Sequence, residues 1–561
     1  MDEEEAPLVL KTQGGFSVKY KGRLLYSSRE PERLPRRVAV ACDSGPGRLH
    51  LVPSPLLWYG LPELLESIGA GSAILCVEAE GALASFARER MPSSLAADPR
   101  VSFIEASSNE EAVAAALAMG DFRFCSIDCL SGGEALHAEL YHSMARAIGS
   151  ELEAEWRNRA ALMVLGRRWA RNIFDNIAAL AEIDPSPLPF FHGAVAVCGA
   201  GASLEDALSF LSAERARISI VACDTALGSL LAYGVMPDLV VCLEGQAHNL
   251  PDFTCLGSRR VSLLADLSSH PATFRAIGGN KHLSLVRITR SPFLDRVASV
   301  LAGEGIPFLD SPPLGSVGVQ SYFAARELSD GPILACGLDF SFEAGKSHAR
   351  GCPSLLAEER CLDRLTRWPS QYGSSFRDRN MALGGERSGG KEGLLSDPIL
   401  LSYAALLDER VRADKEIGRG LYDIRGRGPD IGGVRITLDE ARTIVQRAAS
   451  AAPSRPSPGS KALGASRAAR TILESEIGRL KRLRMAMHGE CAIEGTEFRR
   501  LVLESDYLWW SFPDQGRIKP GLQIQGRDLP QDFLNRLVPE AEWWALRLEA
   551  LEDRLESLPR G

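Results

Sequence analysis

Two short segments of this 561-residue chain place small residues beside groups that bind phosphate or move protons. The first is the turn GAGAS, which starts at residue 199, follows the apolar run AVAVC and precedes the helical pattern LEDALSFLSAER. A strand, a turn of small residues and a helix offer the backbone amides of a helix N-terminus to a phosphate group. We therefore expect Gly199, Ala200, Gly201 and Ser203 to cradle the phosphate and ribose of an anionic ligand.

The second segment follows the apolar run PILAC and carries several ionisable groups, in GLDFS from residue 337 and GKSHARG from residue 345. We expect Asp339 and Ser341 to hold the ligand from the opposite side; Asp339 also suits a tight turn. His348 is the candidate general base, or alternatively a phosphate partner, because its ordinary pKa lies near neutral pH. Lys346 adds a fixed cation beside it, or is merely solvated.

Further polar residues follow neighbouring strand-like runs. Asp224 comes after ISIVAC, Glu244 ends LVVCLE, and Gly315 and Ser316 stand before an apolar helical pattern. Open α/β sheets bind ligands at the carboxyl ends of their strands, where such residues collect. We expect Asp224 to contact ribose or base, with Glu244, Gly315 and Ser316 completing the donor site. Capping of the helix that begins at Thr225 is an equally good role for Asp224.

The elements that position these residues alternate along the chain. Short apolar runs alternate with helical patterns over residues 1–155 and again over 190–395, which is typical of α/β folds. The first stretch predicts a Rossmann-like support domain without a nucleotide, because its loop CDSGPG departs from GxGxxG and contains a proline. A connecting helix and linker at 156–189 leads to a doubly wound α/β domain with a long Gly- and Ser-rich loop at 343–397. Residues 396–561 read as a mainly helical domain.

Composition excludes several classes of protein. The chain is 45% hydrophobic and 24% charged, which describes folded globular domains. The formal net charge of −8 argues against extensive electrostatic binding to nucleic acid. No run approaches the ~20 apolar residues of a membrane helix and the start MDEEE is acidic, so we expect a cytoplasmic protein without a membrane span. The 12 cysteines include no CxxC pair, and we expect buried thiols and no metal site.

The ordered motifs resemble those of a known family. GAGASL, ACDTAL, GVMPDLVVCLEGQ, GSVG and GLDFSFEAGKSHARG, in this order, are similar to the pattern of the motility-associated factor (Maf) flagellin glycosyltransferases. The central domain of that family is classed as similar to 6-hydroxymethylpterin diphosphokinase MptE. The same motifs resemble those of bacterial sialyltransferases that use CMP-sialic acid, where GNGPSL occupies the place of GAGASL and GIDF that of GLDF. Glu244 stands where family members commonly carry Asp.

The resemblance implies an inverting, metal-independent, sialyltransferase-like enzyme. It implies a CMP-activated nonulosonic acid of the pseudaminic, legionaminic or sialic type as donor, with no further cofactor. The implied acceptor is Ser or Thr of flagellin, in support of flagellar assembly and motility. A CMP-sugar already carries a good leaving group, so the protein must orient the acceptor hydroxyl, remove its proton and neutralise the departing phosphate.

Two other functions fit parts of the sequence. A diphosphokinase like the pterin enzyme would need ATP and a divalent metal, for which Asp224, Glu244 and Asp339 offer carboxylates. A non-catalytic motility factor would bind flagellin or its chaperone through the helical tail. The large additional domains favour a protein acceptor over a small pterin.

Overall fold

The computed structural model describes residues 6–183, 185–288, 291–343, 346–365, 381–382, 394–424, 426–448, 464–516, 518, 522 and 529–557. The chain divides into two compact units. The first comprises Met1–Val164, Glu494–Leu503 and Trp509–Leu537, and the second comprises Leu165–Ile493, Glu504–Leu508 and Val538–Gly561. Each unit contains a parallel sheet of its own, as the two alternating stretches of the sequence predict.

The parallel sheet of the first unit has the strand order β6-β5-β4-β7. Its strands are β4 (Arg48–Pro53), β5 (Ala73–Glu78), β6 (Val101–Glu105) and β7 (Phe124–Ile127). Every residue of β5 is buried, because helices pack on both faces of the sheet, and this explains its uninterrupted apolar run. A separate antiparallel sheet contains β1 (Leu8–Thr12), β2 (Gly15–Tyr20) and β3 (Arg23–Leu24).

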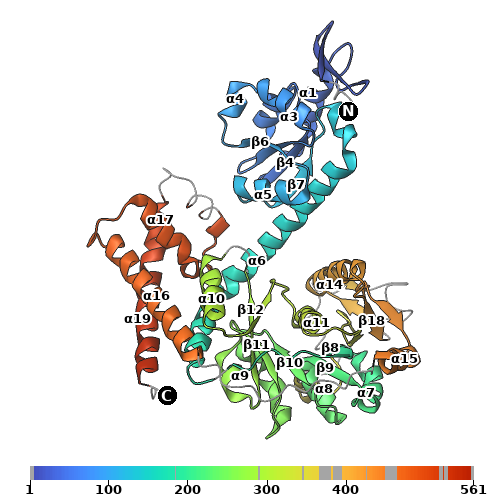
Figure 1. The fold of residues 1–561 in the computed structure, drawn as a ribbon, viewed down its shortest axis with the longest axis vertical. Helices are drawn as coiled ribbons and strands as arrows, with labels where there is room; N and C mark the ends of the chain where they lie inside the picture. The colour runs from blue at the N-terminus through green and yellow to red at the C-terminus, as the bar shows by residue number, and fades with distance from the viewer. Residues whose placement is uncertain are drawn as a thin grey trace. The chain divides into compact units, whose positions relative to one another are not determined.

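Short helices follow the strands of this unit (Figure 1). They are α1 (Arg33–Ala41), α2 (Leu61–Ser67), α3 (Gly81–Glu89), α4 (Ser93–Ala96), α5 (Asn109–Met119) and η1 (Gly132–Leu136). The long helix α6 (Ala138–Ala179) starts in the first unit and ends in the second.

The second unit is built on nine parallel strands in the order β13-β12-β11-β10-β9-β8-β14-β18-β19 (Figure 1). The strands are β8 (Ala194–Cys198), β9 (Ile218–Cys223), β10 (Leu239–Cys242), β11 (Leu263–Asp266), β12 (Lys281–Val286), β13 (Phe308–Ser311), β14 (Ile333–Cys336), β18 (Leu421–Ile424) and β19 (Val434–Ile436). From β8, the chain adds strands β9 to β13 on one side and then β14, β18 and β19 on the other. The order of strands therefore reverses between β8 and β14, which is where open α/β sheets form a ligand crevice.

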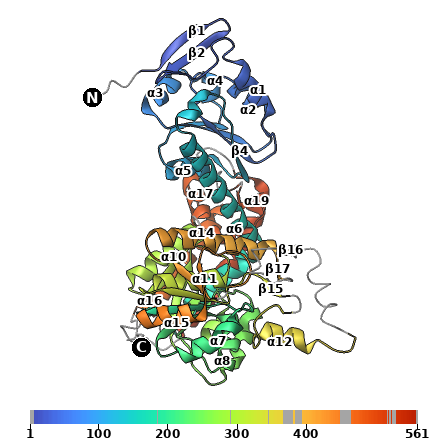
Figure 2. The same cartoon turned by 90° about the vertical axis from the view of Figure 1, so that its right-hand side faces the viewer.

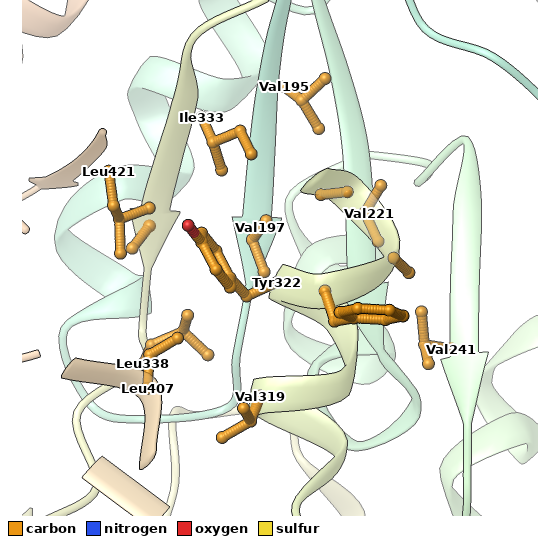
Figure 3. Packing of buried hydrophobic residues seen from close by; sticks show 14 of the residues in the cluster. Val195, Val197, Val221, Val241, Val319, Tyr322, Ile333, Leu338, Leu407 and Leu421 are labelled. Carbon is orange, nitrogen blue, oxygen red and sulfur yellow. The ribbon is translucent and has the colours of Figure 1, made fainter. Parts of the chain in front are cut away.

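Helices cover both faces of this sheet. The helices in this part of the chain include α7 (Leu204–Ala213), η2 (Asp224–Ala226), α8 (Leu227–Ala232), η3 (Ala247–Leu256), α9 (Pro271–Ala276), α10 (Pro292–Gly303), α11 (Val317–Glu327), α14 (Pro398–Glu416) and α15 (Leu438–Ala448). Figure 3 shows part of one buried cluster, to which Val319 and Tyr322 of α11 and Val195 and Val197 of β8 belong, with Tyr322 next to Val197. Each fully buried aliphatic side chain of this kind stabilises the fold by about 1.5–3 kcal/mol.

The central fold continues beyond its predicted end at residue 395. β18 and β19 extend the sheet beside β14, and Ala441 and Val445 of α15 pack in the same core as α7. The boundary expected at residues 395/396 therefore lies too early, although residues 396–561 are mainly helical, as expected. The strands escaped prediction because they are four and three residues long, and a short apolar run does not reveal its distant partner strand. The helical part of the tail consists of α16 (Ala465–Met487), α17 (Gly495–Glu504), η5 (Asp506–Leu508) and α19 (Gln531–Glu556).

Two other boundaries differ from the expected ones. Helix α6 begins at Ala138, inside the stretch assigned to the first domain, because helical residues continue without a break into the expected connecting helix. The stretch 343–397 contains α12 (Pro353–Arg360) and the small sheet β15-β17-β16, formed by Phe342–Glu343, Leu394–Ser396 and Met381–Ala382 (Figure 2). The rest of that predicted loop, 366–380 and 383–393, lies outside the described residues.

All 12 cysteines are free thiols, as the absence of CxxC pairs from the sequence indicates. Six are buried, whereas Cys129 and Cys361 are exposed, because both lie in loops just beyond a strand or a helix. Across the described ranges we find no helix that is both long and apolar enough to cross a membrane.

Candidate functional site

The two motif-bearing turns meet at the point where the strand order reverses, and Asp339 joins them. The backbone N–H of Ser203 donates to one oxygen of Asp339 (2.8 Å), and the Ser203 hydroxyl donates to the other. Ser203 is wholly buried and Asp339 is 2% exposed. The carboxylate of Asp339 therefore occupies the N-terminus of α7, the place that the sequence assigns to a phosphate group.

Close packing of the turns also explains their glycines. A Cβ atom on Gly201 would lie 2.5 Å from Asp339 Oδ2, and one on Gly337 would lie 2.6 Å from the carbonyl oxygen of Gly199. The N–H of Gly201 donates to the carbonyl of Gly337 (2.9 Å). Ala200 and Gly201 are only half-buried, so the surface that this turn offers to a ligand lies around these two residues.

An unusual backbone conformation marks the turn after β14. Phe340 has a φ of 45°, in the left-handed region that residues other than glycine seldom adopt. Ser341 is 7% exposed, and its hydroxyl oxygen has no hydrogen-bond partner among the described residues. Strained residues and unpaired buried polar groups gather at ligand sites. This turn therefore keeps Ser341 as a candidate ligand contact.

Asp423 of β18 carries a second buried carboxyl on the strand next to β14. Burial and the charge of Asp339 raise the pKa of Asp423 to about 7. Burial also raises the pKa of Asp339, against the hydrogen bonds from Ser203 that lower it. Arg435 lies 3.9 Å from Asp423 and compensates part of its charge. The two carboxyls therefore form an electrostatically coupled pair beneath the site.

Asp224 belongs to another buried carboxyl pair, at the end of β9. Its oxygens accept hydrogen bonds from the Thr225 N–H (2.9 Å) and the Asn249 amide (3.1 Å), and it is 3% exposed. Burial and the charge of Asp224 raise the pKa of Asp252 to about 7. Asp224 thus makes the local turn contact that the sequence allows, and Asn249 of η3 is a further partner.

The other three candidate donor residues shape loops at the ends of β10 and β13. Glu244 accepts a hydrogen bond from the N–H of Gln246 (2.7 Å). Ser316 is the N-cap of α11 and accepts from the N–H of Gly318 (3.2 Å). Gly315 has a φ of 69°, which its lack of a side chain permits.

The carboxylates considered for a divalent metal have separate surroundings. Asp224 is bound by Asn249, Glu244 closes its own loop, and Asp339 binds Ser203. Within the part of the chain that the structure describes, no group of three His, Cys, Asp or Glu side chains is arranged to hold a metal ion. The three acids therefore do not form the cluster that the diphosphokinase alternative requires.

The segment after β15 is fixed to the first turn of α7 by Glu205. Lys346 Nζ lies 2.7 Å from Glu205 Oε1, and the backbone N–H of Arg350 donates to the same oxygen (2.7 Å). The Ala349 N–H donates to the carbonyl of Ala200 (2.8 Å). Lys346 is therefore paired with a carboxylate, and the whole segment lies against the GAGASL turn.

His348 is oriented by hydroxyl groups of its own segment. Its Nδ1 lies 3.0 Å from the hydroxyl of Ser347 and 3.1 Å from that of Ser354. The Ser347 hydroxyl donates to Glu358 (2.9 Å), so its oxygen can accept from Nδ1–H, and in that tautomer Nε2 is the unprotonated nitrogen. Burial lowers the pKa of His348, against the charge of Glu358 that raises it, and so favours the neutral ring.

Sequence reasoning missed the charged residue that ties three parts of this region together. Arg427, which follows β18, pairs with Asp206 of α7 (2.6 Å) and with Glu343 of β15. The available signal was the acidic pair Glu205-Asp206 at the start of α7, but acids in a first helical turn are common and do not reveal distant partners.

Comparisons with known proteins agree with this architecture. Residues 169–345 match the family described as 6-hydroxymethylpterin diphosphokinase MptE-like. An uncharacterized protein of Treponema pallidum (strain Nichols) is 29% identical over 375 residues, which span 65% of this chain and 64% of that protein. The structure of a Maf glycosyltransferase from Magnetospirillum magneticum AMB-1 is similar with a TM-score of 0.54 at 14% identity. That match covers 99% of this chain and 94% of the Magnetospirillum chain.

Proposed function

This chain contains an MptE-like domain within the fold of a Maf glycosyltransferase, as its motifs predict, and on this basis we propose that it transfers a sugar to a protein. The proposed donor is a CMP-activated nonulosonic acid of the pseudaminic, legionaminic or sialic type. The proposed acceptor is Ser or Thr of flagellin. The proposed mechanism is inverting, sialyltransferase-like and independent of a metal ion or further cofactor.

The main support for this proposal is that the turns after β8 and β14 lie in contact with each other. Parallel sheets bind ligands where their strand order reverses, and here both turns that resemble the donor motifs lie at that point. Ala200 and Gly201 offer backbone, and Ser341 offers a buried hydroxyl without a described partner. We assign the donor phosphate to this surface. Asp339 and Ser203 then act by holding the turns together, since their polar groups already bind each other.

His348 is the proposed general base, and its surroundings suit that role. The relay from Nδ1–H through Ser347 to Glu358 fixes the ring and leaves Nε2 basic. Nε2 takes the proton of the acceptor hydroxyl while the hydroxyl oxygen bonds to the anomeric carbon. The bond from that carbon to the phosphate oxygen breaks, and CMP leaves with the electron pair. Lys346, paired with Glu205, positions this segment and adds electrostatic support to the departing phosphate.

Ligand binding separates this proposal from a diphosphokinase, which the name of the matched family also suggests. CMP is expected to raise the melting temperature of the full chain saturably without added metal. Ser341→Ala should weaken the CMP effect, because it removes a hydroxyl that has no described internal partner. Ser299→Ala, on the exposed face of α10, is the matched control and should leave the effect intact. A shift with Mg²⁺ and ATP but none with CMP would establish the diphosphokinase instead.

Transfer itself is tested with the full chain, flagellin and a CMP-nonulosonate. Intact-mass spectrometry should show flagellin heavier by one or more sugar residues, and fragment spectra should place them on Ser or Thr. Flagellin that binds the protein but gains no mass under these conditions would favour the non-catalytic motility factor.

A further inference from the structure

A pocket of about 620 Å³ in the second unit is lined by residues of α6, α9 and α19. Figure 1 labels these three helices. Its size lies within the roughly 300–1,000 Å³ that is typical of small-molecule sites. Its ionisable lining residues are Arg171 and Asp175 of α6, Arg275 of α9, Arg547 of α19, and His270. None of these residues belongs to the proposed donor site.

The pocket is built on rigid parts of the unit. Asn172 of α6 donates hydrogen bonds from Nδ2 to the carbonyls of Gly245 and Ser268 (2.8 Å each). These carbonyls belong to the loops that follow β10 and β11, so α6 is held against the carboxyl ends of both strands. Asn172 is 1% exposed, which shields these bonds from water. The side chains that line the pocket therefore project from a fixed framework.

Positive charge exceeds negative charge in the lining. Arg547 binds Asp175 through two contacts of 2.5 and 2.7 Å, which neutralises one arginine. Arg275 donates only to the main-chain carbonyl of Asp175 (3.3 Å), and Arg171 makes no ion pair with any described residue. Two guanidinium groups thus share one pocket without a compensating carboxylate. Guanidinium groups in this situation bind oxyanions through paired N–H donors.

His270 adds a further hydrogen-bond donor. Its Nδ1 accepts a hydrogen bond from the N–H of Ala272 (3.2 Å), so the neutral ring carries its proton on Nε2. Burial and the charges of Arg171 and Arg168 lower the pKa of His270. The two arginine charges thus lower this pKa in the same direction as burial does, and a bound anion would offset them.

We propose that this pocket is a second binding site, which holds a small molecule through a phosphate or carboxylate group. Arg171 and Arg275 bind the oxyanion directly, and Arg547 stays with Asp175 as part of the wall. The site goes beyond the proposed transfer reaction, because its ligand contacts come from α6 and α9 and not from the turns after β8 and β14.

Binding of inorganic phosphate and of malonate to the full chain tests this proposal. Calorimetric titrations at constant ionic strength, adjusted with sodium chloride, should show saturable binding of at least one anion. The two titrations distinguish a phosphate-selective site from a carboxylate-selective one. Arg171→Gln and Arg275→Gln should each weaken binding about tenfold or more, since a charge-assisted hydrogen bond contributes about 1.5–3 kcal/mol. Both arginines are exposed, so these variants should fold.

Arg412→Gln is the matched control, because it removes an exposed arginine of α14 outside the pocket and should leave anion binding unchanged. The effect of CMP on the melting temperature should also survive in Arg275→Gln, which separates this site from the donor site. No saturable binding of either anion would overturn the proposal. Equal binding in the parent and the Arg171→Gln, Arg275→Gln double variant would overturn it too, because the anion would then be bound elsewhere.

Discussion

Asp339 binds both the backbone N–H and the hydroxyl of Ser203, a residue 136 positions earlier in the chain. This contact places a carboxylate where a helix N-terminus would otherwise receive a phosphate group. The GLDF motif and the GAGASL motif are therefore held together by this contact, and the proposed donor binds on the surface that the two turns form.

Asp339→Ala is expected to destabilise the second unit by about 1–3 kcal/mol, because it leaves the buried N–H of Ser203 without an acceptor. Asp339→Asn should cost less, since the amide oxygen still accepts that bond and the Ser203 hydroxyl can turn to accept from the amide. Urea denaturation of the parent and both variants measures the difference. Equal stability of Asp339→Ala and the parent would contradict a stabilising role for the contact between Ser203 and Asp339.

Gly201→Ala is expected to destabilise the protein by about 1–3 kcal/mol, as overpacking of a fixed site does. The added methyl group would lie 2.5 Å from a carboxylate oxygen of Asp339 and force the two turns apart. Gly303→Ala is the control: a Cβ atom at that helical position meets no atom within 4 Å. Denaturation curves should show a loss for the first variant and none for the second.

His348→Ala is expected to lower sugar transfer about 10²-fold to 10⁴-fold, the usual contribution of a positioned general base. CMP affinity should remain close to that of the parent, because the proposed phosphate surface lies on other residues. His192→Ala, which alters an exposed histidine paired with Asp330, is the control and should leave transfer unchanged. Unchanged transfer by His348→Ala at saturating donor would remove this residue from the mechanism.

Ser347→Ala tests whether the relay positions His348. The variant removes the hydroxyl oxygen that accepts from Nδ1–H and ends the contact to Glu358. Transfer should fall by less than in His348→Ala, and the acidic limb of its pH profile should shift to lower pH, because the ring loses a group that stabilises its protonated form. A rate and profile identical to those of the parent would show that the relay does not act on the base.

Asp423 makes stability depend on pH in a specific direction. Its pKa is about 7 in the folded protein, against an ordinary value of roughly 3.9 in an unfolded chain. Between these values the folded state binds more protons, so this residue reduces stability as the pH rises from about 4 to 7. The free energy of unfolding of Asp423→Asn should therefore exceed that of the parent by more at pH 8 than at pH 4. Denaturation of both proteins at the two pH values checks this, and a constant difference would contradict it.

The sequence predicted the core of the second unit well, because parallel strands covered on both faces are continuous apolar runs. AVAVC and ISIVAC are buried at every position of β8 and β9. It also predicted that polar residues collect at the strand ends, since the residues after successive strands share one edge of a parallel sheet. Glu205 escaped notice as the anchor of Lys346, because nothing in a local pattern reveals a contact 141 positions away in chain numbering.

The sequence by itself determined which continuous apolar runs form buried strands such as β8 and β9, which turns contain glycine and which families the motifs resemble, because these properties are set by neighbours in the chain. Only the tertiary structure decided that Ser203 binds Asp339, that β18 and β19 complete the sheet, and that Arg171 and Arg275 share a pocket. Each of these depends on segments far apart in the chain. Their pairing is selected by the packing of the whole unit, where burial removes water as a competing partner and makes one arrangement of polar groups far more favourable than the others.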